Sequence, residues 1–228
     1  MGSNSNKSAM SILVRIQDFV PGWAVGDIND ELGIVCNAFN HVIDLCPIEL
    51  LVRHSAAWSE FSDSDTGEDV DGKKVLEVFS VMSGLNNMRR QCREVKLGEF
   101  EQTQYSGSTF YATKLTPVFC IDSQVATNLL KVMPADIPVR YTYITYFDPS
   151  AVTSALTATI FAENNHLPGT IEVAMILQAC INLMRTKIAV ASVDDEDDEL
   201  IAIYNANIAS CEGQLAKEMQ RITGKKAE

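Results

Sequence analysis

Residues 171–184, with the sequence IEVAMILQACINLM, decide more about the fold of this chain than any other segment. The segment is apolar almost all round, a composition typical of a helix that other elements cover on most sides. It follows the helix-breaking sequence Leu167-Pro168-Gly169, which separates it from the preceding part of the chain. We therefore expect the central helix of the fold here, with other helices packed around it.

Three further segments have the three-to-four-residue apolar spacing of amphipathic helices. The first spans residues 8–19 and ends at Pro21-Gly22, and the second spans residues 27–46 and ends before Pro47. The last begins in the acidic run at residues 194–199 and carries basic residues at its end, an order that matches the helix dipole. Their apolar stripes comprise Met10, Leu13 and Ile16 in the first, Ile28, Leu32, Val35, Phe39 and Val42 in the second, and Ile201, Tyr204, Ile208, Cys211, Leu215 and Ile222 in the last.

The middle of the chain, from residue 75 to about residue 161, is rich in short β-branched and aromatic runs separated by turn residues. The predicted strands lie at residues 75–81, 93–97, 109–113, 117–121, 129–133 and 139–147. In the last run Tyr141, Tyr143 and Phe147 alternate, which favours packing in a core over a stacking platform for bases. We expect a small antiparallel sheet or sandwich.

These patterns predict an α+β fold in which N-terminal and C-terminal helices form a bundle and a β part is inserted between them. The predicted boundaries are 1–58 for the N-terminal helices, 59–74 for a solvent-exposed acidic loop, 75–165 for the inserted β domain and 166–228 for the C-terminal helices. The acidic segment is assigned to a loop because it is polar, contains two glycines and offers almost nothing to bury.

Composition narrows the possible functions. The chain has 228 residues, a formal net charge of −12 and a pI near 4.7, which argues against nucleic-acid binding, since a surface that neutralises phosphates draws on clustered Lys and Arg. Its apolar stretches are interrupted before the length of about 20 residues that crosses a bilayer, and no transmembrane segment is predicted. The six cysteines show no CxxC spacing and are predicted to be reduced, mostly buried residues of a cytoplasmic protein.

No motif indicates catalysis. The chain has no GxxxxGK[ST] loop, no GxGxxG turn, no GxSxG elbow and no HExxH, and His41, His54 and His166 lie far apart in sequence. The acidic runs at 63–72 and 194–199 could hold Ca²⁺, but the first departs from EF-hand spacing and the second suits a helix start. We predict no enzyme, no catalytic residue, no cofactor and no metal site, and interpret both runs as solvated charged segments.

Several stretches resemble a known family. They are residues 11–18 in the opening helix, Trp23 followed by residues 28–32 and 37–40, the β segments 117–122, 129–134 and 141–146, the helix start His166-Leu167-Pro168-Gly169-Thr170, and Tyr204-Asn205-Ala206 in the last helix. In this arrangement the chain is similar to the head–tail connector, or adaptor, proteins of tailed bacteriophages, which form a ring beneath the portal. It departs from their pattern in the long acidic segment before Val75 and in its extended β middle.

The resemblance implies a structural virion protein rather than an enzyme. Its partners would be identical chains in a twelve-fold ring, the portal protein, and tail or further neck proteins, with no membrane. DNA would pass through the channel without specific binding, helped by an acidic lining. The location would be the neck of the virion, and the host cytoplasm during assembly. The resemblance also makes Lys217, Arg221, Lys225 and Lys226 candidates for contact with the portal or a neighbour, although a solvated helix end accounts for them equally well.

Other classes of protein fit the same patterns. The chain could be another neck or tail-completion protein, or a cytoplasmic scaffold whose β part binds a protein partner. An enzyme whose acidic loops hold a metal is a further possibility. Assembly with a portal would favour the adaptor, a stable isolated monomer the scaffold, and metal-dependent stability the enzyme.

Overall fold

The computed structural model describes residues 9–23, 28–54, 58–61, 66–82, 88–123, 127–135, 137–148, 167, 169–191 and 198–224. The chain divides into two compact units, and each is treated by itself. The helix unit comprises Met1–His54 together with Phe147–Glu228, and the β unit comprises Ser55–Tyr146. Helices and antiparallel or mixed sheets are both present, so the predicted α+β class is confirmed.

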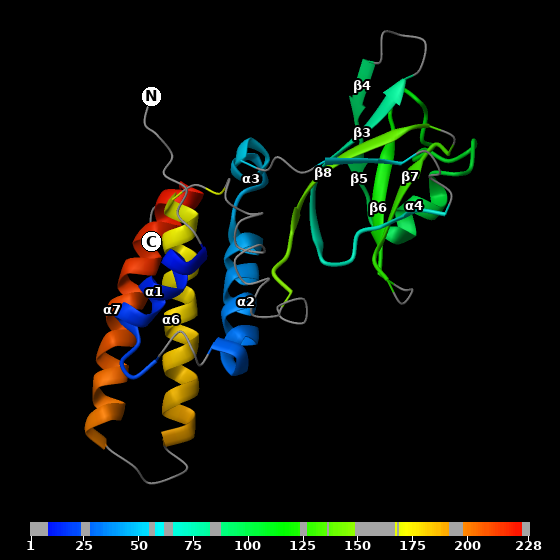
Figure 1. The fold of residues 1–228 in the computed structure, drawn as a ribbon. Helices are drawn as coiled ribbons and strands as arrows, with labels where there is room; N and C mark the ends of the chain where they lie inside the picture. Colours follow the sequence, from blue (N-terminus) through cyan, green and yellow to red (C-terminus); the bar gives the residue numbers. More distant parts are fainter. Residues whose placement is uncertain are drawn as a thin grey trace, which may run out of the picture. The chain divides into compact units, whose positions relative to one another are not determined.

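The helix unit contains five described helices (Figure 1). They are α1 (Ala9–Phe19), α2 (Ile28–Leu45), α3 (Ile48–His54), α6 (Gly169–Ala191) and α7 (Asp198–Thr223). All four predicted helices are present. The bounds of α1 and α2 lie within one residue of the prediction, whereas α6 continues to Ala191, seven residues beyond the predicted segment. The short helix α3 was missed, because its seven residues are too few to show a clear apolar period.

Helix α6 forms the centre of this unit, as its all-round apolar sequence predicted. It contacts α1, α2 and α7, and ten of its residues are buried. Ion pairs join its polar positions to three neighbouring helices: Arg15–Glu172 at 2.7 Å to α1, Lys187–Glu31 at 2.9 Å to α2, and Arg185–Glu212 at 2.7 Å to α7. By length and hydropathy α6 could also cross a membrane, but the covering of a core helix by its neighbours explains the same composition.

An asparagine on α2 fixes the point at which the chain re-enters the helix unit. The side-chain amide of Asn40 donates to the carbonyl oxygen of Phe147 at 2.9 Å, and its oxygen accepts the Phe147 N–H at 2.8 Å. The neighbouring Phe39 ring packs edge-on against the Phe147 ring, with centroids 5.2 Å apart. Phe147 thus serves the core of the helix unit, whereas Tyr141 and Tyr143, with which the sequence grouped it, lie in the β unit.

The β unit contains two four-stranded sheets (Figure 1). The first has the order β1 (Trp58–Phe61), β8 (Val139–Thr145), β3 (Lys73–Met82), β4 (Met88–Gln91), and the second has the order β2 (Glu68–Asp69), β7 (Leu129–Met133), β6 (Val118–Asp122), β5 (Arg93–Glu94). A short helix, α4 (Leu97–Gln102), follows β5. All pairings are antiparallel except β5 with β6, which is parallel, so the predicted purely antiparallel sheet was wrong in this detail.

The two sheets share one core and are linked by short chain segments at two places. Residues from both sheets form a common buried cluster, which comprises Val70, Val78, Cys92, Phe119, Leu130, Val132, Val139 and Tyr141. Cys92 connects β4 of the first sheet with β5 of the second, and its N–H donates to the Val78 carbonyl oxygen at 2.8 Å. Residues 70–72 connect β2 with β3 in the same way. The sequence predicted either a small sheet or a sandwich, and two sheets that share one core correspond to the sandwich.

Three local predictions need correction. The segment 59–74 is not one exposed loop, because it contains most of β1, all of β2 and the start of β3, and Val70 is only 2% exposed in the shared core. Residues 109–113 are not a strand but turns before an isolated bridge between Thr113 and Thr116. The strand expected at 93–97 ends at Glu94, because α4 begins at Leu97. Residues 149–165 lie outside the described part of the chain.

Candidate interaction surfaces

The last turns of α7 carry two of the four cations predicted to contact a portal or neighbour. Lys217 and Arg221 are both exposed and lie four residues apart, so they share one face of the helix. Arg221 is already paired with Glu218 on the preceding turn at 2.6 Å. Lys225 and Lys226 lie outside the described residues. Of the four candidates, the structure therefore brings together Lys217, which is exposed, and Arg221, which is exposed but already pairs with Glu218.

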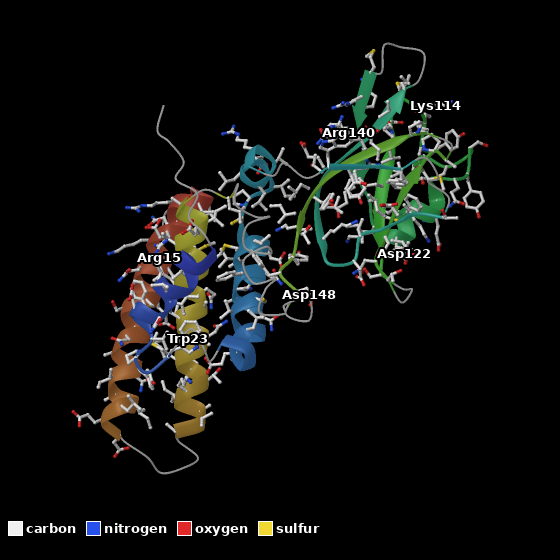
Figure 2. All side chains as sticks on the ribbon, in the orientation of Figure 1. Arg15, Trp23, Lys114, Asp122, Arg140 and Asp148 are labelled. Atoms are coloured by element: carbon white, nitrogen blue, oxygen red, sulfur yellow. The ribbon has the colours of Figure 1, made fainter. Side chains whose placement is uncertain are left out.

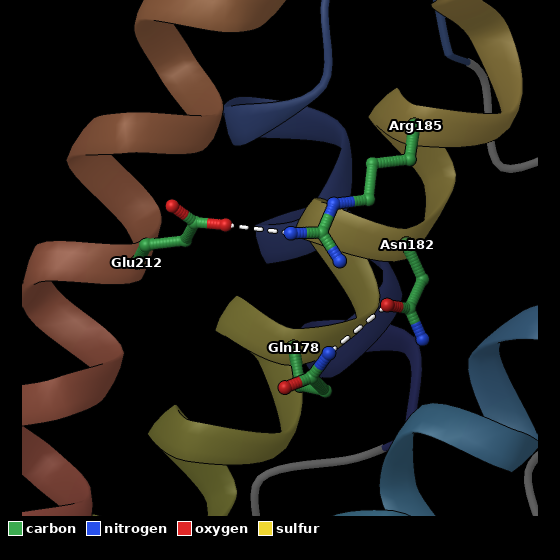
Figure 3. Close-up of polar contacts among 4 residues, drawn as sticks. All are labelled: Gln178, Asn182, Arg185 and Glu212. Atoms are coloured by element: carbon green, nitrogen blue, oxygen red, sulfur yellow. Dashed lines mark hydrogen bonds and ion pairs between the residues drawn. The ribbon is translucent and has the colours of Figure 1, made fainter. Parts of the chain in front are cut away.

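Helix α7 is held to the helix unit along its opposite face. The Tyr204 hydroxyl donates to the carbonyl oxygen of Pro21 at 3.0 Å, and Ile208, Cys211 and Ile222 are buried. Arg185 of α6 reaches Glu212 of α7 at 2.7 Å (Figure 3). On α6 itself the amide of Gln178 donates to the oxygen of Asn182 at 2.9 Å, which satisfies a polar pair beside the buried face (Figure 3). These contacts fix α7 with its exposed face available.

Acidic residues of the segment from β2 to β3 serve local structure. The Tyr141 hydroxyl donates to Glu68 at 3.3 Å and accepts from the Lys73 ammonium at 3.2 Å. Asp69 accepts the backbone N–H of Asp71 at 2.9 Å, and this turn is where the chain passes between the sheets. Within the described residues no group of three or more His, Cys, Asp or Glu side chains could hold a metal ion.

The ionisation of Tyr141 and Lys73 also fits a structural role. Burial raises the pKa of Tyr141 above its usual value, so the phenol keeps its proton at neutral pH. For Lys73 burial acts to lower the pKa, but the hydrogen bond with Tyr141 and the electrostatic interactions with Tyr141, Tyr143 and Glu68 outweigh it and raise the pKa overall. The neutral phenol and the charged ammonium hold one another in place through their hydrogen bond, and neither group is in the form of a general base.

A loop in the β unit displays large apolar side chains on an ordered backbone. Between α4 and β6 the exposed large hydrophobic residues are Tyr105, Phe110, Tyr111 and Leu115. The base of the loop is closed by the N–H of Ala112, which donates to the Thr103 carbonyl oxygen at 3.0 Å, and both residues are buried. Exposed aromatic residues on a rigid loop are typical of protein-binding surfaces. This surface was not predicted from the sequence, because residues 109–113 were assigned to a strand.

A basic edge is the second surface that was not predicted from the sequence. It comprises Arg89 and Arg90 in β4, Arg93 in β5 and Lys96 just before α4, all of them exposed. None of the four forms an ion pair with another described residue. In the same unit Arg140 stacks on the ring of Trp58 at 3.7 Å and faces Glu60, and Lys131 binds Asp122. Figure 2 labels Arg140 and Asp122. The sequence did contain a signal for this surface, because four cations lie within eight residues of an otherwise acidic chain.

Comparison with known proteins gives no further guide to this chain. No protein-family model, no curated protein and no solved structure matches it. The function must therefore be proposed from the surfaces themselves and from the resemblance in the sequence.

Proposed function

We propose that this chain is a structural connector subunit, an adaptor that forms a ring between the portal and the tail of a tailed bacteriophage. One observation carries the proposal. Helices from both ends of the chain form one compact unit, and the β unit is inserted between them as a second compact unit. This is the arrangement that the resemblance to adaptor proteins implies. An adaptor requires no reaction, only surfaces that bind identical neighbours and the adjoining virion proteins.

In this proposal the two units have different partners. The exposed end of α7, with Lys217 and Arg221 followed in sequence by Lys225 and Lys226, contacts the portal or a neighbouring subunit. The aromatic loop of the β unit supplies a contact to a tail or further neck protein, because exposed Tyr and Phe side chains on a fixed backbone bind protein surfaces at low entropic cost. The net charge of −12 disfavours DNA binding along the channel.

The location of the chain in the virion tests the proposal. Antibody labelling of the parent virion, viewed by negative-stain electron microscopy, should place the chain at the head–tail junction. The purified chain mixed with portal complexes should add a ring to the portal. Replacing Lys217 and Arg221 with glutamine should weaken this addition if they meet the portal. Absence of the chain from the virion would exclude the adaptor role.

The aromatic loop favours a second candidate, a protein-binding scaffold that is not part of a virion. Its four exposed apolar residues give a protein partner an anchoring surface, whatever the setting. The same labelling experiment separates the two candidates. A scaffold would be absent from virions, and alanine at Tyr105 and Tyr111 would abolish capture of its partner while leaving the fold unchanged.

A further inference from the structure

The basic edge lies where the chain passes from one sheet of the β unit to the other. Strand β4 is the last strand of the first sheet and β5 is the last strand of the second, so residues 88–94 form an outer edge of both (Figure 1). Every residue of these two strands is exposed. Within residues 88–96 the four cations of the basic edge are accompanied by one acidic residue, Glu94. The edge is therefore a local positive surface on an acidic chain.

Strand β4 also presents backbone groups that no described residue uses. The Cys92 N–H donates to the Val78 carbonyl oxygen of β3 at 2.8 Å, and in this antiparallel register residues 88 and 90 face β3 as well. Because these groups alternate in direction along a strand, the N–H and C=O groups of Arg89 and Gln91 point away from β3. They form no hydrogen bond with another residue in the described part of the chain. The side of β4 opposite β3 is thus an open sheet edge.

Apolar side chains accompany the cations at both ends of this edge. Met88 is exposed at the start of β4. At the other end the Arg93 N–H donates to the carbonyl oxygen of Pro117 at 3.0 Å, two positions after the exposed Leu115 of the aromatic loop. A peptide strand that adds to a sheet edge gains affinity from backbone hydrogen bonds and specificity from its alternate side chains. The basic edge offers contacts of both kinds.

We infer that the open edge of β4 binds an extended acidic segment of a partner protein, which joins the first sheet as a further strand. The backbone of this segment pairs with the outward N–H and C=O groups of Arg89 and Gln91, and its carboxylates meet the cations of the basic edge. Charge complementarity selects the partner, because one acidic residue accompanies four cations on this edge. The inference goes beyond the proposed adaptor role and does not depend on it.

Two other roles for the basic edge predict different outcomes. Charged residues on an edge strand can simply prevent strand pairing, and in that case β4 binds no peptide and neutralising its arginines promotes self-association. A single-stranded nucleic acid can bind clustered cations, and in that case binding requires the arginines but not the outward N–H of Gln91. The peptide is favoured over nucleic acid because an open backbone edge matches another strand, and because the acidic chain as a whole repels phosphates.

Fluorescence anisotropy of a labelled peptide mixed with the full chain provides the test. The probe is an alternating glutamate–valine peptide of about eight residues, which is within the usual length of a strand. One control peptide has lysine in place of glutamate, and another is the acidic peptide methylated on every backbone nitrogen, which keeps its charge but cannot donate hydrogen bonds. The acidic peptide should bind at an ionic strength on the order of 0.01 M and weaken at about 1 M salt. Both control peptides should bind at least about tenfold more weakly.

Two variants separate the contribution of charge from that of strand pairing. Arg89→Gln with Arg93→Gln removes two cations, whereas Gln91→Pro removes one outward N–H, a change that an edge strand tolerates. Each variant should weaken binding of the acidic peptide by about tenfold. The matched control, Arg53→Gln with Arg185→Gln, removes two exposed cations of the helix unit and should bind the peptide as the wild-type chain does.

Amide hydrogen exchange of the wild-type chain gives a readout that needs no variant. Saturation with the acidic peptide should slow exchange at Arg89 and Gln91, whose N–H groups become hydrogen-bonded. The inference would be overturned by an acidic peptide that does not bind at up to about 1 mM, by binding that survives the arginine changes, or by equal binding of the methylated peptide. Arginine-dependent binding of single-stranded oligothymidylate in preference to the peptide would also overturn it. Virion labelling tests the adaptor role separately, so a chain found at the neck that binds no peptide would sink this inference alone.

Discussion

The two units of this protein build their cores in opposite ways. The helix unit is organised around one segment, α6, whose buried residues follow one another along a single helix and contact three other helices. The core of the β unit is assembled from residues spread between Val70 and Tyr141, contributed by several strands and connections. A core centred on one helix can therefore be read from local sequence, whereas a core shared between two sheets depends on how distant strands pair.

The polar contacts of the two units do not follow this division. In the helix unit the ion pairs Arg15–Glu172 and Lys187–Glu31 connect helices that are far apart in sequence. In the β unit the carboxylates of the β2–β3 segment mostly stabilise their own turn or the nearby Tyr141 hydroxyl. The four cations of the basic edge form no ion pair with another described residue.

The largest expected effect comes from creating a cavity in either core. Leu183 of α6 and Leu130 of β7 are fully buried, and changing either to alanine should lower the free energy of unfolding by about 2–5 kcal/mol. Each change should destabilise its own unit, because the two leucines lie in separate cores. Urea denaturation can follow both units through their tryptophans, since Trp23 lies in the helix unit and Trp58 in the β unit.

Single-tryptophan variants, Trp58→Phe and Trp23→Phe, assign the signals. The Leu183→Ala change should shift the Trp23 transition more than the Trp58 transition, and Leu130→Ala should do the reverse. Equal shifts of both signals would mean that the units unfold as one cooperative body and would break the contrast between the two cores.

A smaller effect is expected at the point where the chain re-enters the helix unit. The Asn40→Ala change removes both hydrogen bonds to the Phe147 backbone and leaves a partly buried N–H and C=O without these partners. The free energy of unfolding should fall by about 1–3 kcal/mol. The control is Asn37→Ala, an exposed position on the same helix, which should stay within about 0.5 kcal/mol of wild type in the same urea titration.

The buried cysteines predict a gradual loss of stability at alkaline pH in both units. Burial raises the pKa of Cys180 in the helix unit and of Cys92 in the β unit to about 12, from an ordinary value of 9.0. Between these values an unfolded thiol loses its proton while the native thiol keeps it, so unfolding becomes easier as the pH rises. Each thiol should contribute a loss of roughly 1 kcal/mol per pH unit above pH 9.

This dependence can be measured by urea denaturation between pH 8 and pH 11 under reducing conditions. The Cys180→Ala change should flatten the alkaline slope of the Trp23 transition, and Cys92→Ala should flatten that of the Trp58 transition, beyond any constant cost of the cavity. An unchanged slope in both variants would show that other groups cause the loss. Native Cys180 and Cys92 should also react slowly with thiol reagents, because both thiols are buried and protonated.

The smallest expected effect concerns the ion pair between α6 and α7. Arg185 and Glu212 are both largely exposed, so Arg185→Ala should lower the free energy of unfolding by less than about 1 kcal/mol. High salt should abolish most of the difference between the variant and wild type. Arg15→Ala provides a comparison, since its partner Glu172 is more buried and the loss should be larger and less sensitive to salt. Equal effects at the two positions would argue against burial as the cause.

Much of the architecture could be predicted from local patterns. The apolar period located α1, α2, α6 and α7, and the β-branched runs located β3, β6, β7 and β8. The errors fell where local pattern and tertiary environment disagree. Glu68 and Asp69 form a strand because β7 pairs with them, and the adjacent Val70 is buried because the chain crosses between the sheets there. The exposed aromatic residues of the loop before β6 misled the prediction, since aromatic residues favour strands as well as binding surfaces.

The sequence by itself determined the α+β class, the central place of α6 and the acidic character of the chain, because these depend on composition and on spacing along one element. Only the tertiary structure decided that the sheets share one core, that β5 pairs in parallel with β6, and that Asn40 binds Phe147. It also showed that four cations lie exposed on or beside the edge strands. The physical reason is that strand pairing and long-range hydrogen bonds join residues distant in sequence, and local periodicity carries no information about such partners.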